Sequence, residues 1–410
     1  MKILGLILES NPFHNGHKYF IEESLKLSQD KPFDYVIAIT STSFCMRGEI
    51  SVIDKFTKTK LYLENNIDLV LELPNYLSIN SSDQFCFNAI NILSKFKITD
   101  LSFGSEIGDI EKLKELSNYL SSPSFNIYLK NHLDKGLSYS ASINQSLIDL
   151  GLDKSNVNEF SKPNNTLAIG YIKAIKNLGL NINLHTIKRI DNNYYDDNIN
   201  INSNLASANQ IRNLLRNKED ITKYIPNDIY KKIGFNGFID EETGKKRMLE
   251  LLKYNFLIHS NKDNLDPFYK SIHLVNEGIE NRIYSFINKC NSYDELIKNV
   301  QTKRYNINRI NRILINILLE KRNDYTNDEE IITYLRILGM NEKGKTLLSK
   351  LDKETKKIII SNINKLDDMP KILDFELKSS RLYDILTDNN TYELEFKTPI
   401  KMDTLGDKNA

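Results

Sequence analysis

The sharpest chemical signal in the sequence is the run NPFHNGH at residues 11–17, which follows an apolar stretch and opens a helical pattern. Gly16 lets the backbone approach a ligand closely, and the start of a helix offers unpaired N–H groups to a phosphate. His14 and His17 lie on the same side of a first helical turn, where both imidazoles can donate to phosphate oxygens. Such donors stabilise the charge that builds on an α-phosphate as pyrophosphate leaves. The motif therefore predicts nucleotidyl transfer, with His14 and His17 as catalytic residues.

Metal or thiol chemistry finds less support. A zinc site at the histidine pair would need further ligands, and none of the other histidines is suitably spaced: His132, His185, His259 and His273. Three cysteines are too few and too scattered for a disulfide framework or a thiolate zinc site: Cys45, Cys86 and Cys290. Cys45 also lacks a nearby His–Asp arrangement, which argues against covalent thiol catalysis. We therefore expect no metal site built by the protein itself.

Apolar runs and amphipathic stretches alternate around the motif, which is typical of a parallel sheet covered by helices. Four strands are expected, over residues 2–8, 34–40, 68–73 and 100–103. The helices expected between them cover residues 16–27, 52–64 and 83–96. Ligands of such sheets bind beyond the carboxyl ends of the strands. Chemistry is therefore expected in the segments that follow the strands: residues 9–17, 41–49, 74 onward and 104–106.

The remaining sequence predicts further elements of the first domain and then a second domain that consists of helices. Additional elements are expected as helices over residues 110–152, 162–177 and 207–216 and a strand over 182–187. From about residue 235 to 386 the pattern indicates helices alone, and residues 391–402 alternate weakly, as in a terminal strand. We predict an α/β protein: a Rossmann-like, parallel-sheet nucleotidyltransferase domain over residues 1–235, followed by an all-helical domain over residues 236–410.

Length and composition restrict the class of protein. The 410 residues fit about two or three domains, and 40% hydrophobic with 27% charged residues is ordinary for a globular chain. Because 55 Lys+Arg nearly balance 54 Asp+Glu, a nucleic acid would have to be held by a local basic patch. No apolar run is long enough to span a membrane, and the N-terminus is unlike a signal peptide. We expect a cytoplasmic protein that binds no membrane.

Six short motifs stand together in the first 215 residues or so: ESNPFHNGH at 9–17, RGE at 47–49, DK at 54–55, FGSE at 103–106, KPNN at 162–165 and ASANQIR at 206–212. Their combination resembles the bacterial tRNA(Met) cytidine acetate ligase family of the HxGH nucleotidyltransferase superfamily, which shares its fold with class I aminoacyl-tRNA synthetases. The combination is far more specific than HxGH alone. For residues beyond about 240, only the general helical layout is similar.

The resemblance implies an activity: ATP-dependent formation of N4-acetylcytidine at the wobble position of elongator tRNA(Met). Acetate would attack the α-phosphate of ATP, giving acetyl-adenylate and pyrophosphate. The exocyclic amine of the cytidine would then attack the acyl carbon and release AMP. Magnesium is expected with ATP, held largely by phosphates and water. Acetate as the acyl donor follows from the resemblance alone.

The resemblance also implies which residues bind ATP. Gly104 would lie against the nucleotide, one of Asn164 and Asn165 would hydrogen-bond it, and Arg189 with Ile190 would contact the adenine or ribose. Ser207 and Arg212 would face pyrophosphate. Lys18 either reaches phosphate or lies on the surface, and the surface is favoured. The first segment would surround the nucleotide with Ile7, Leu8, Glu9, Ser10, Asn11, Pro12, Phe13, His14, Asn15, Gly16, His17, Lys18, Tyr19 and Phe20.

Three charged residues near these motifs can be interpreted from sequence. Arg47 and Lys55 each have two interpretations, and Glu72 has a structural one. Arg47 and Lys55 either contact phosphate or tRNA, or pair as surface charges with Glu49 and Asp54. Glu72 lies within an expected strand, where a structural acceptor is a better interpretation than a catalytic base.

The segment 303–322 is the best candidate for RNA binding. It carries Ile307 in an apolar stripe at helical spacing, while Arg309 and Arg312 project roughly opposite. A helix packed in this way leaves cations for phosphates, although an ordinary solvated helix face gives the same pattern. We predict tRNA contacts by Arg304, Arg309 and Arg312. The full set of cations in the segment, against the single acid Glu320, is Lys303, Arg304, Arg309, Arg312, Lys321 and Arg322.

Two other functions remain as alternatives to the ligase. A small-molecule adenylyltransferase would use the same chemistry on a phosphorylated cofactor precursor, but would not need the long helical extension. A non-catalytic RNA-binding protein with a relic nucleotide pocket would not need the intact His14, His17 and Arg212.

Overall fold

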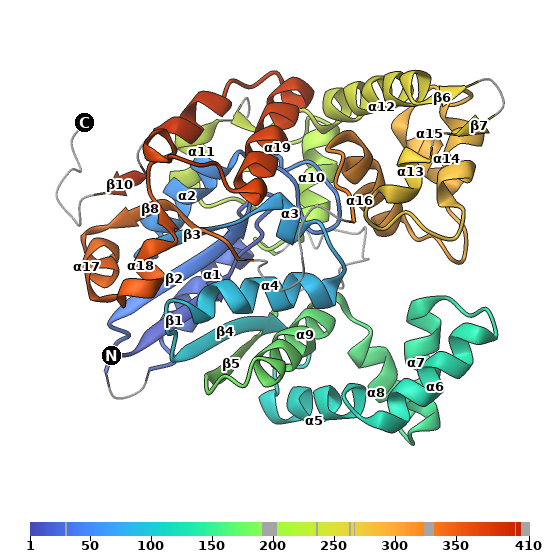
Figure 1. Cartoon of the computed structure of the whole chain (residues 1–410). Helices are drawn as coiled ribbons and strands as arrows, with labels where there is room; N and C mark the ends of the chain where they lie inside the picture. The colour runs from blue at the N-terminus through green and yellow to red at the C-terminus, as the bar shows by residue number, and fades with distance from the viewer. Residues whose placement is uncertain are drawn as a thin grey trace.

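A parallel sheet forms the centre of the computed structural model, which describes residues 1–28, 31–190, 203–234, 237–261, 264–265, 267–323, 332–397 and 399–402. Its strands run in the order β10-β8-β3-β2-β1-β4-β5. The four strands predicted for a parallel sheet pair in parallel, and the further strand expected over 182–187 extends the sheet in the same direction. They are β1 (Ile3–Ile7), β2 (Tyr35–Ser41), β3 (Leu69–Leu73), β4 (Asp100–Ser105) and β5 (Asn183–Lys188). Figure 1 shows them side by side at the centre of the molecule.

Helices cover both faces of this sheet because alternate strand residues point to opposite sides. Ile3 and Ile37 belong to one buried cluster with residues of α4 (Ser82–Ser94) and α9 (Pro163–Asn177). Leu4 and Val36 belong to a second cluster with residues of α1 (Asn15–Leu25) and α2 (Lys55–Glu64). The β-α-β order between each pair of parallel strands therefore produces three layers, and the expected fold class is confirmed.

Two groups of helices extend from the sheet on the same side, α6–α8 below and α12–α16 above in Figure 1. They approach each other at Gly136, where a Cβ atom would lie 3.8 Å from Nη2 of Arg304. The first group follows α5 (Ile110–Leu120): α6 (Pro123–Asp134), α7 (Tyr139–Asp149) and α8 (Lys154–Phe160). The second comprises α12 (Glu241–Ile258), α13 (Phe268–Ser271), α14 (Ile279–Ile287), α15 (Tyr293–Val300) and α16 (Ile307–Leu318).

The prediction of helices alone from residue 235 to 386 is wrong at several places. Ser260–Asn261 (β6) and Asn264–Leu265 (β7) form a short antiparallel pair, and Ile359–Ile360 (β9) is a short strand. Residues Leu335–Asn341 form β8, which pairs antiparallel with β3 and returns the chain to the central sheet. All but the last residue of β8 are buried, so the sequence LRILGMN lacks the apolar–polar alternation of a half-exposed strand. Of the expected terminal strand, only β10 (Ile400–Met402) forms, in parallel with β8, while Tyr392–Phe396 is a 3-10 helix.

Strand β8 carries Arg336 into a buried ion cluster that joins the two halves of the chain. Lys55 at the start of α2 contacts Glu72 of β3 at 2.9 Å, Glu376 of α19 (Lys371–Thr387) at 3.0 Å and Glu395 at 2.7 Å. Arg336 pairs with Glu72 and Glu395. Both interpretations of Lys55 from sequence are therefore wrong, because its charge is buried within the protein. Glu72 is a structural acceptor, as expected.

Candidate active site

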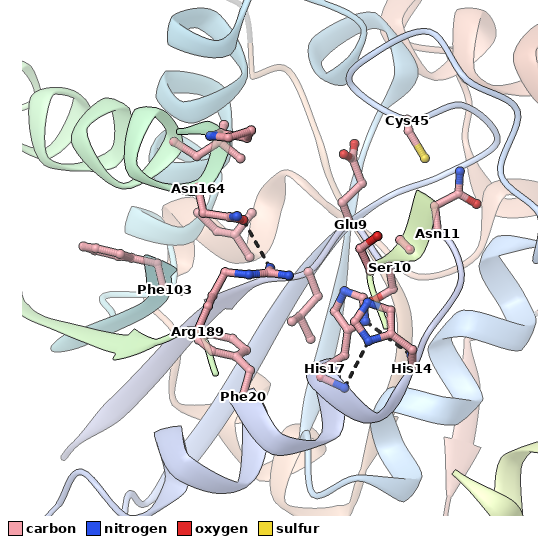
Figure 2. Close-up of a pocket in the computed structure, with 18 of the residues that line it drawn as sticks. Glu9, Ser10, Asn11, His14, His17, Phe20, Cys45, Phe103, Asn164 and Arg189 are labelled. Carbon is pink, nitrogen blue, oxygen red and sulfur yellow. Dashed lines mark hydrogen bonds between the residues drawn. The ribbon is translucent and has the colours of Figure 1, made fainter. Parts of the chain in front are cut away.

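A pocket lies beyond the carboxyl ends of β1, β4 and β5, where the sheet order places a ligand site. It collects residues from the loop after β2 (Ser43 to Ile50) and from α1, α9 and α10 (Ala208–Arg216) as well. Figure 2 shows His14 and His17 on one side, with Phe103, Asn164 and Arg189 on the other. The predicted ATP residues that line it are Ile7, Leu8, Glu9, Ser10, Asn11, His14, Gly16, His17, Tyr19, Phe20, Gly104, Asn164, Arg189, Ile190, Ser207 and Arg212.

The histidine pair forms the start of α1. His14 is the N-cap residue, and its Nδ1 accepts a hydrogen bond from the backbone N–H of Gly16 at 3.0 Å. Nδ1 of His17 accepts in turn from the backbone N–H of His14 at 3.3 Å. Since each Nδ1 is an acceptor, each neutral ring carries its proton on Nε2. The ring centroids are 4.0 Å apart, so the two Nε2–H donors serve the same part of the pocket.

The pocket keeps both histidines uncharged. Burial lowers the pKa of His14 well below its ordinary value, and the charges of Arg189 and Arg212 lower it further. Burial and then Arg189 lower the pKa of His17 to about 3. Neutral imidazoles can still donate to phosphate oxygens, while the positive charge of the site comes from the arginines.

Several residues of the first segment do not line the pocket, contrary to what the resemblance implies for them. Phe13 is fully buried in the core and stacks against His17, with ring centroids 5.6 Å apart. The side chain of Asn15 donates to the backbone oxygens of residues 204 and 223, on the outer side of the helix start. Pro12 is buried, and Lys18 lies beside Asn15 in a separate surface hollow. Phe13 and Asn15 therefore hold the motif against the core and the neighbouring backbone.

The segment that begins α10 supplies polar groups at another edge of the pocket. Ser207 caps the helix, and its Oγ accepts from the backbone N–H of Gln210. Arg212 is buried: Nη1 donates to the backbone oxygen of Asn11 at 2.7 Å, and Nη2 lies 3.1 Å from Glu49. Arg212 therefore presents its charge to the pocket from a fixed position, with Glu49 as its counter-ion.

The two candidate asparagines have different environments. Asn165 is fully buried, with Oδ1 accepting from the backbone N–H groups of Glu106 and Ile107 and Nδ2 donating to the backbone oxygen of Glu159. Its amide is committed to the fold, and it does not line the pocket. Asn164 does line it, and its Oδ1 accepts from Nη1 of Arg189 at 3.4 Å, as drawn in Figure 2.

The loop after β2, within the segment 41–49 where chemistry is expected, contributes pocket residues beyond those that the resemblance gives to ATP. Asn11 holds this loop in place. Its Nδ2 donates to the backbone oxygen of Ile50 at 3.2 Å, and its Oδ1 accepts from the backbone N–H of Val52 at 2.7 Å. Arg47 lines the pocket, while Glu49 pairs with Arg212 and Asp54 caps α2. The sequence signal for these additional residues is the position of their loop after a parallel strand. The additional lining residues are Cys45, Met46, Arg47, Glu49, Phe85, Phe103, Pro163, Leu167, Tyr171, Ile187, Lys188, Leu205, Ala206 and Ala208.

Gly104 and Cys45 illustrate what this lining can do chemically. A Cβ atom on Gly104 would meet protein atoms only at 3.9 Å or more, so glycine here leaves room for a ligand rather than for packing. Burial raises the pKa of the Cys45 thiol, which makes thiolate chemistry unfavourable.

The predicted tRNA-binding residues lie near α16, outside the pocket. Arg304 is exposed. Arg309 pairs with Glu277 at 3.1 Å and lies over the Tyr305 ring. Arg312 is only partly exposed, and burial together with Arg309 and Arg47 lowers its pKa to about 10.

Two other residues of this segment differ from expectation. Lys321 is 1% exposed, and its Nζ donates to the backbone oxygens of Tyr76 at 2.8 Å and Ile79 at 3.2 Å, so it cannot bind RNA. Ile307, placed in the apolar stripe, is 46% exposed.

Across the ranges that the structure describes, no cluster of three or more His, Cys, Asp or Glu side chains is placed to hold a metal ion. No helix in those same ranges is both long and apolar enough to cross a membrane.

A parallel sheet with a neutral histidine pair at its carboxyl edge, beside Ser207 and Arg212, defines a nucleotidyltransferase of the HxGH class. The family profile described as HIGH Nucleotidyl Transferase matches residues 1–397. A tRNA(Met) cytidine acetate ligase of Clostridium perfringens is 34% identical over 94% of this chain and 96% of its own length. The ligase of the same name from Staphylococcus haemolyticus is 34% identical over 98% of both chains. The chain belongs to the tRNA(Met) cytidine acetate ligase family.

Solved structures agree with this assignment. The apo crystal structure of Thermotoga maritima TmcAL has a TM-score of 0.86 and 30% identity, covering 98% of this chain and all of the other. A second structure of that protein, bound with alpha-thio ATP, has a TM-score of 0.83 and 29% identity over the same coverage.

Proposed function

We propose that this chain uses ATP to ligate acetate to the N4 amine of the wobble cytidine in elongator tRNA(Met). The observation that carries the proposal is the neutral histidine pair at the start of α1, held in a pocket with Arg189 and Arg212. The curated relatives named tRNA(Met) cytidine acetate ligase match nearly the whole chain, which favours this function over a small-molecule adenylyltransferase or a non-catalytic RNA-binding protein.

The reaction proceeds in two steps. Acetate attacks the α-phosphate of ATP, and pyrophosphate leaves with the electron pair of the broken P–O bond. His14 and His17 donate through Nε2 to the phosphate oxygens on which charge builds, which stabilises the transition state. The cytidine amine then attacks the acyl carbon of acetyl-adenylate, and AMP leaves.

ATP occupies the pocket of the α/β part, within residues 1–235. Asn164, Arg189 and Ile190 approach the nucleoside, with Gly104 leaving space for it. Ser207 at the start of α10 and the fixed Arg212 face pyrophosphate. The buried hydrogen bonds of Asn165 favour Asn164 as the asparagine that contacts the nucleotide. Magnesium accompanies ATP and is held by phosphate oxygens and water, a mode that needs no protein cage.

The anticodon arm of the tRNA contacts the helical group α12–α16, which lies within residues 236–410, and Arg304, Arg309 and Arg312 contribute phosphate contacts. Arg304 supports this assignment because it is exposed where the two helical groups approach each other. The enzyme acts in the cytoplasm, where tRNA and ATP meet.

Analysis of tRNA nucleosides by mass spectrometry tests the proposal in the cell. Deleting the gene is expected to abolish N4-acetylcytidine in elongator tRNA(Met), and a plasmid copy is expected to restore it. A His14→Ser plasmid copy, which retains a hydroxyl to cap α1, should not restore it. Unchanged N4-acetylcytidine in the deletion strain would contradict the proposed function.

A further inference from the structure

The carboxylate of Glu9 faces a different part of the pocket from the histidine pair. Glu9 lies two residues beyond the end of β1 and lines the pocket. In Figure 2 its side chain points away from His14 and His17, on the side where Cys45 lies. If the histidines serve the phosphates, Glu9 faces the space that remains for the second substrate.

Hydrogen bonds to one oxygen fix the orientation of this carboxylate. Oε1 of Glu9 accepts from the backbone N–H of Met46 at 2.5 Å and from Oγ of Ser41 at 3.1 Å. Within the described part of the chain, Oε2 accepts no hydrogen bond. One oxygen therefore anchors the group to the loop after β2, and the other is left for a ligand in the pocket.

The two acids of this pocket differ in their charge environment. Glu49 forms an ion pair with Arg212 at 3.1 Å. Among the described residues, Glu9 has no cation within ion-pair distance, although Arg47 and Lys58 act on it from further away. Burial is the largest influence, and it raises the pKa of Glu9. A carboxylate with a raised pKa is a better proton acceptor than one in water.

The charge of the Glu9 carboxylate determines which ligand groups can bind next to it. It repels phosphate and acetate, which carry the same charge, and attracts N–H donors. The exocyclic amine of a cytosine is such a donor, and it must lose a proton when it forms an amide. Glu9 therefore matches the nucleophile of the second step better than either substrate of the first.

We propose that Glu9 binds the cytidine amine and is the general base of acyl transfer, an inference that rests on the proposed function. Oε2 accepts one N4–H and directs the amine nitrogen toward the acyl carbonyl carbon. The C–N bond forms, the bond from the acyl carbon to the phosphate oxygen breaks, and AMP leaves with that electron pair. The amine proton passes to Glu9 and then to water, which restores the carboxylate.

The substitution Glu9→Gln tests this role because it retains size and an oxygen that accepts from Met46 and Ser41, but removes the base. Two rates are measured on the purified protein: acetate-dependent exchange of labelled pyrophosphate into ATP, and single-turnover transfer from acetyl-adenylate to tRNA. We expect transfer to fall by about 10²- to 10⁴-fold. Exchange should fall by much less than transfer, because Glu9 lines the ATP pocket but acts as a base only after adenylate formation.

Glu49→Gln is the matched control, since it removes a charge from the same pocket but disturbs Arg212. There, exchange is expected to fall at least as much as transfer. If Glu9→Gln lowers exchange and transfer equally, Glu9 serves ATP or its magnesium and the proposal is wrong; unchanged transfer would also overturn it.

Two further measurements cover the case in which Glu9→Gln does not fold and the case in which the proposed function itself is wrong. If Glu9→Gln does not fold, Glu9→Asp retains the charge but retracts the base, and the same selective loss of transfer is expected; equal losses, or none, would overturn the proposal. Failure of the proposed function itself would look different, because the wild-type protein would then show no acetate-dependent exchange at all.

Discussion

Gly48, in the loop that lines the pocket, packs directly against the backbone of Arg312 in α16. A Cβ atom on Gly48 would lie 2.5 Å from the backbone nitrogen of Arg312, and Gly48 has φ = +76°. Only glycine satisfies both conditions at low cost. The loop that lines the pocket and the helix proposed to bind tRNA are therefore in direct contact.

Gly48→Ala is expected to lower the free energy of unfolding by about 2–5 kcal/mol, from backbone strain and overpacking together. It should also weaken tRNA binding, because α16 must move. Gly151→Ala is the matched control: Gly151 has φ = +94° with no atom within 4 Å of a Cβ, so only about 1–2 kcal/mol of strain applies. Chemical denaturation and tRNA titration measure both effects. Equal losses in the two variants would show that the contact with Arg312 carries no cost.

Replacing the histidines separates their two roles. His14→Ala removes both the N-cap and the Nε2 donor, whereas His14→Ser keeps a capping hydroxyl. Both should slow pyrophosphate exchange by about 10- to 1,000-fold, the range for one lost transition-state donor. Only His14→Ala should also lower the free energy of unfolding, by about 0.5–2 kcal/mol. Near-normal exchange in His14→Ser would mean that the imidazole serves the fold alone.

The pH dependence of adenylate formation follows from the lowered histidine pKa values. Because burial keeps His14 and His17 neutral, with the pKa of His17 at about 3, the exchange rate should show no histidine step between pH 6 and 8. Protein stability should respond instead. The unfolded chain takes up protons below the ordinary histidine pKa of about 6.5 while the folded chain does not, so the free energy of unfolding falls as pH drops below that value. A sigmoidal change in the exchange rate centred near pH 6.5 would contradict this prediction. It would show that a histidine titrates at its ordinary pKa and that its charge controls the reaction.

Salt dependence tests whether α16 holds RNA. Arg309→Gln should weaken tRNA binding and lower the slope of log affinity against log salt by roughly one unit, if Arg309 leaves Glu277 for a phosphate. Lys26→Gln serves as the control, since this exposed lysine ends α1 at the opposite end from the pocket. Filter binding over a salt series gives both slopes. Identical slopes for the two variants would place the tRNA surface elsewhere.

The sequence predicted the four parallel strands, the further strand that extends them and the pocket position because all three depend on local patterns: apolar runs, helix starts and turns after strands. It did not predict β8, since Arg336 and Gly339 interrupt the apolar run of Leu335–Asn341 and its partner β3 lies far away along the chain. Nor could it show that Lys55 and Lys321 are buried, because their partners lie at least 17 residues away along the chain. A lysine without its partners in view is expected on the surface.

The most direct test of the ligase is its choice of acyl donor in a purified reaction. Protein, ATP, labelled acetate and unmodified elongator tRNA(Met) are combined, and the tRNA is digested to nucleosides. The proposed function predicts label in N4-acetylcytidine, one AMP and one pyrophosphate for each acetyl group, and no modification when acetyl-coenzyme A replaces acetate and ATP. Modification from acetyl-coenzyme A alone, or none from acetate and ATP, would contradict it.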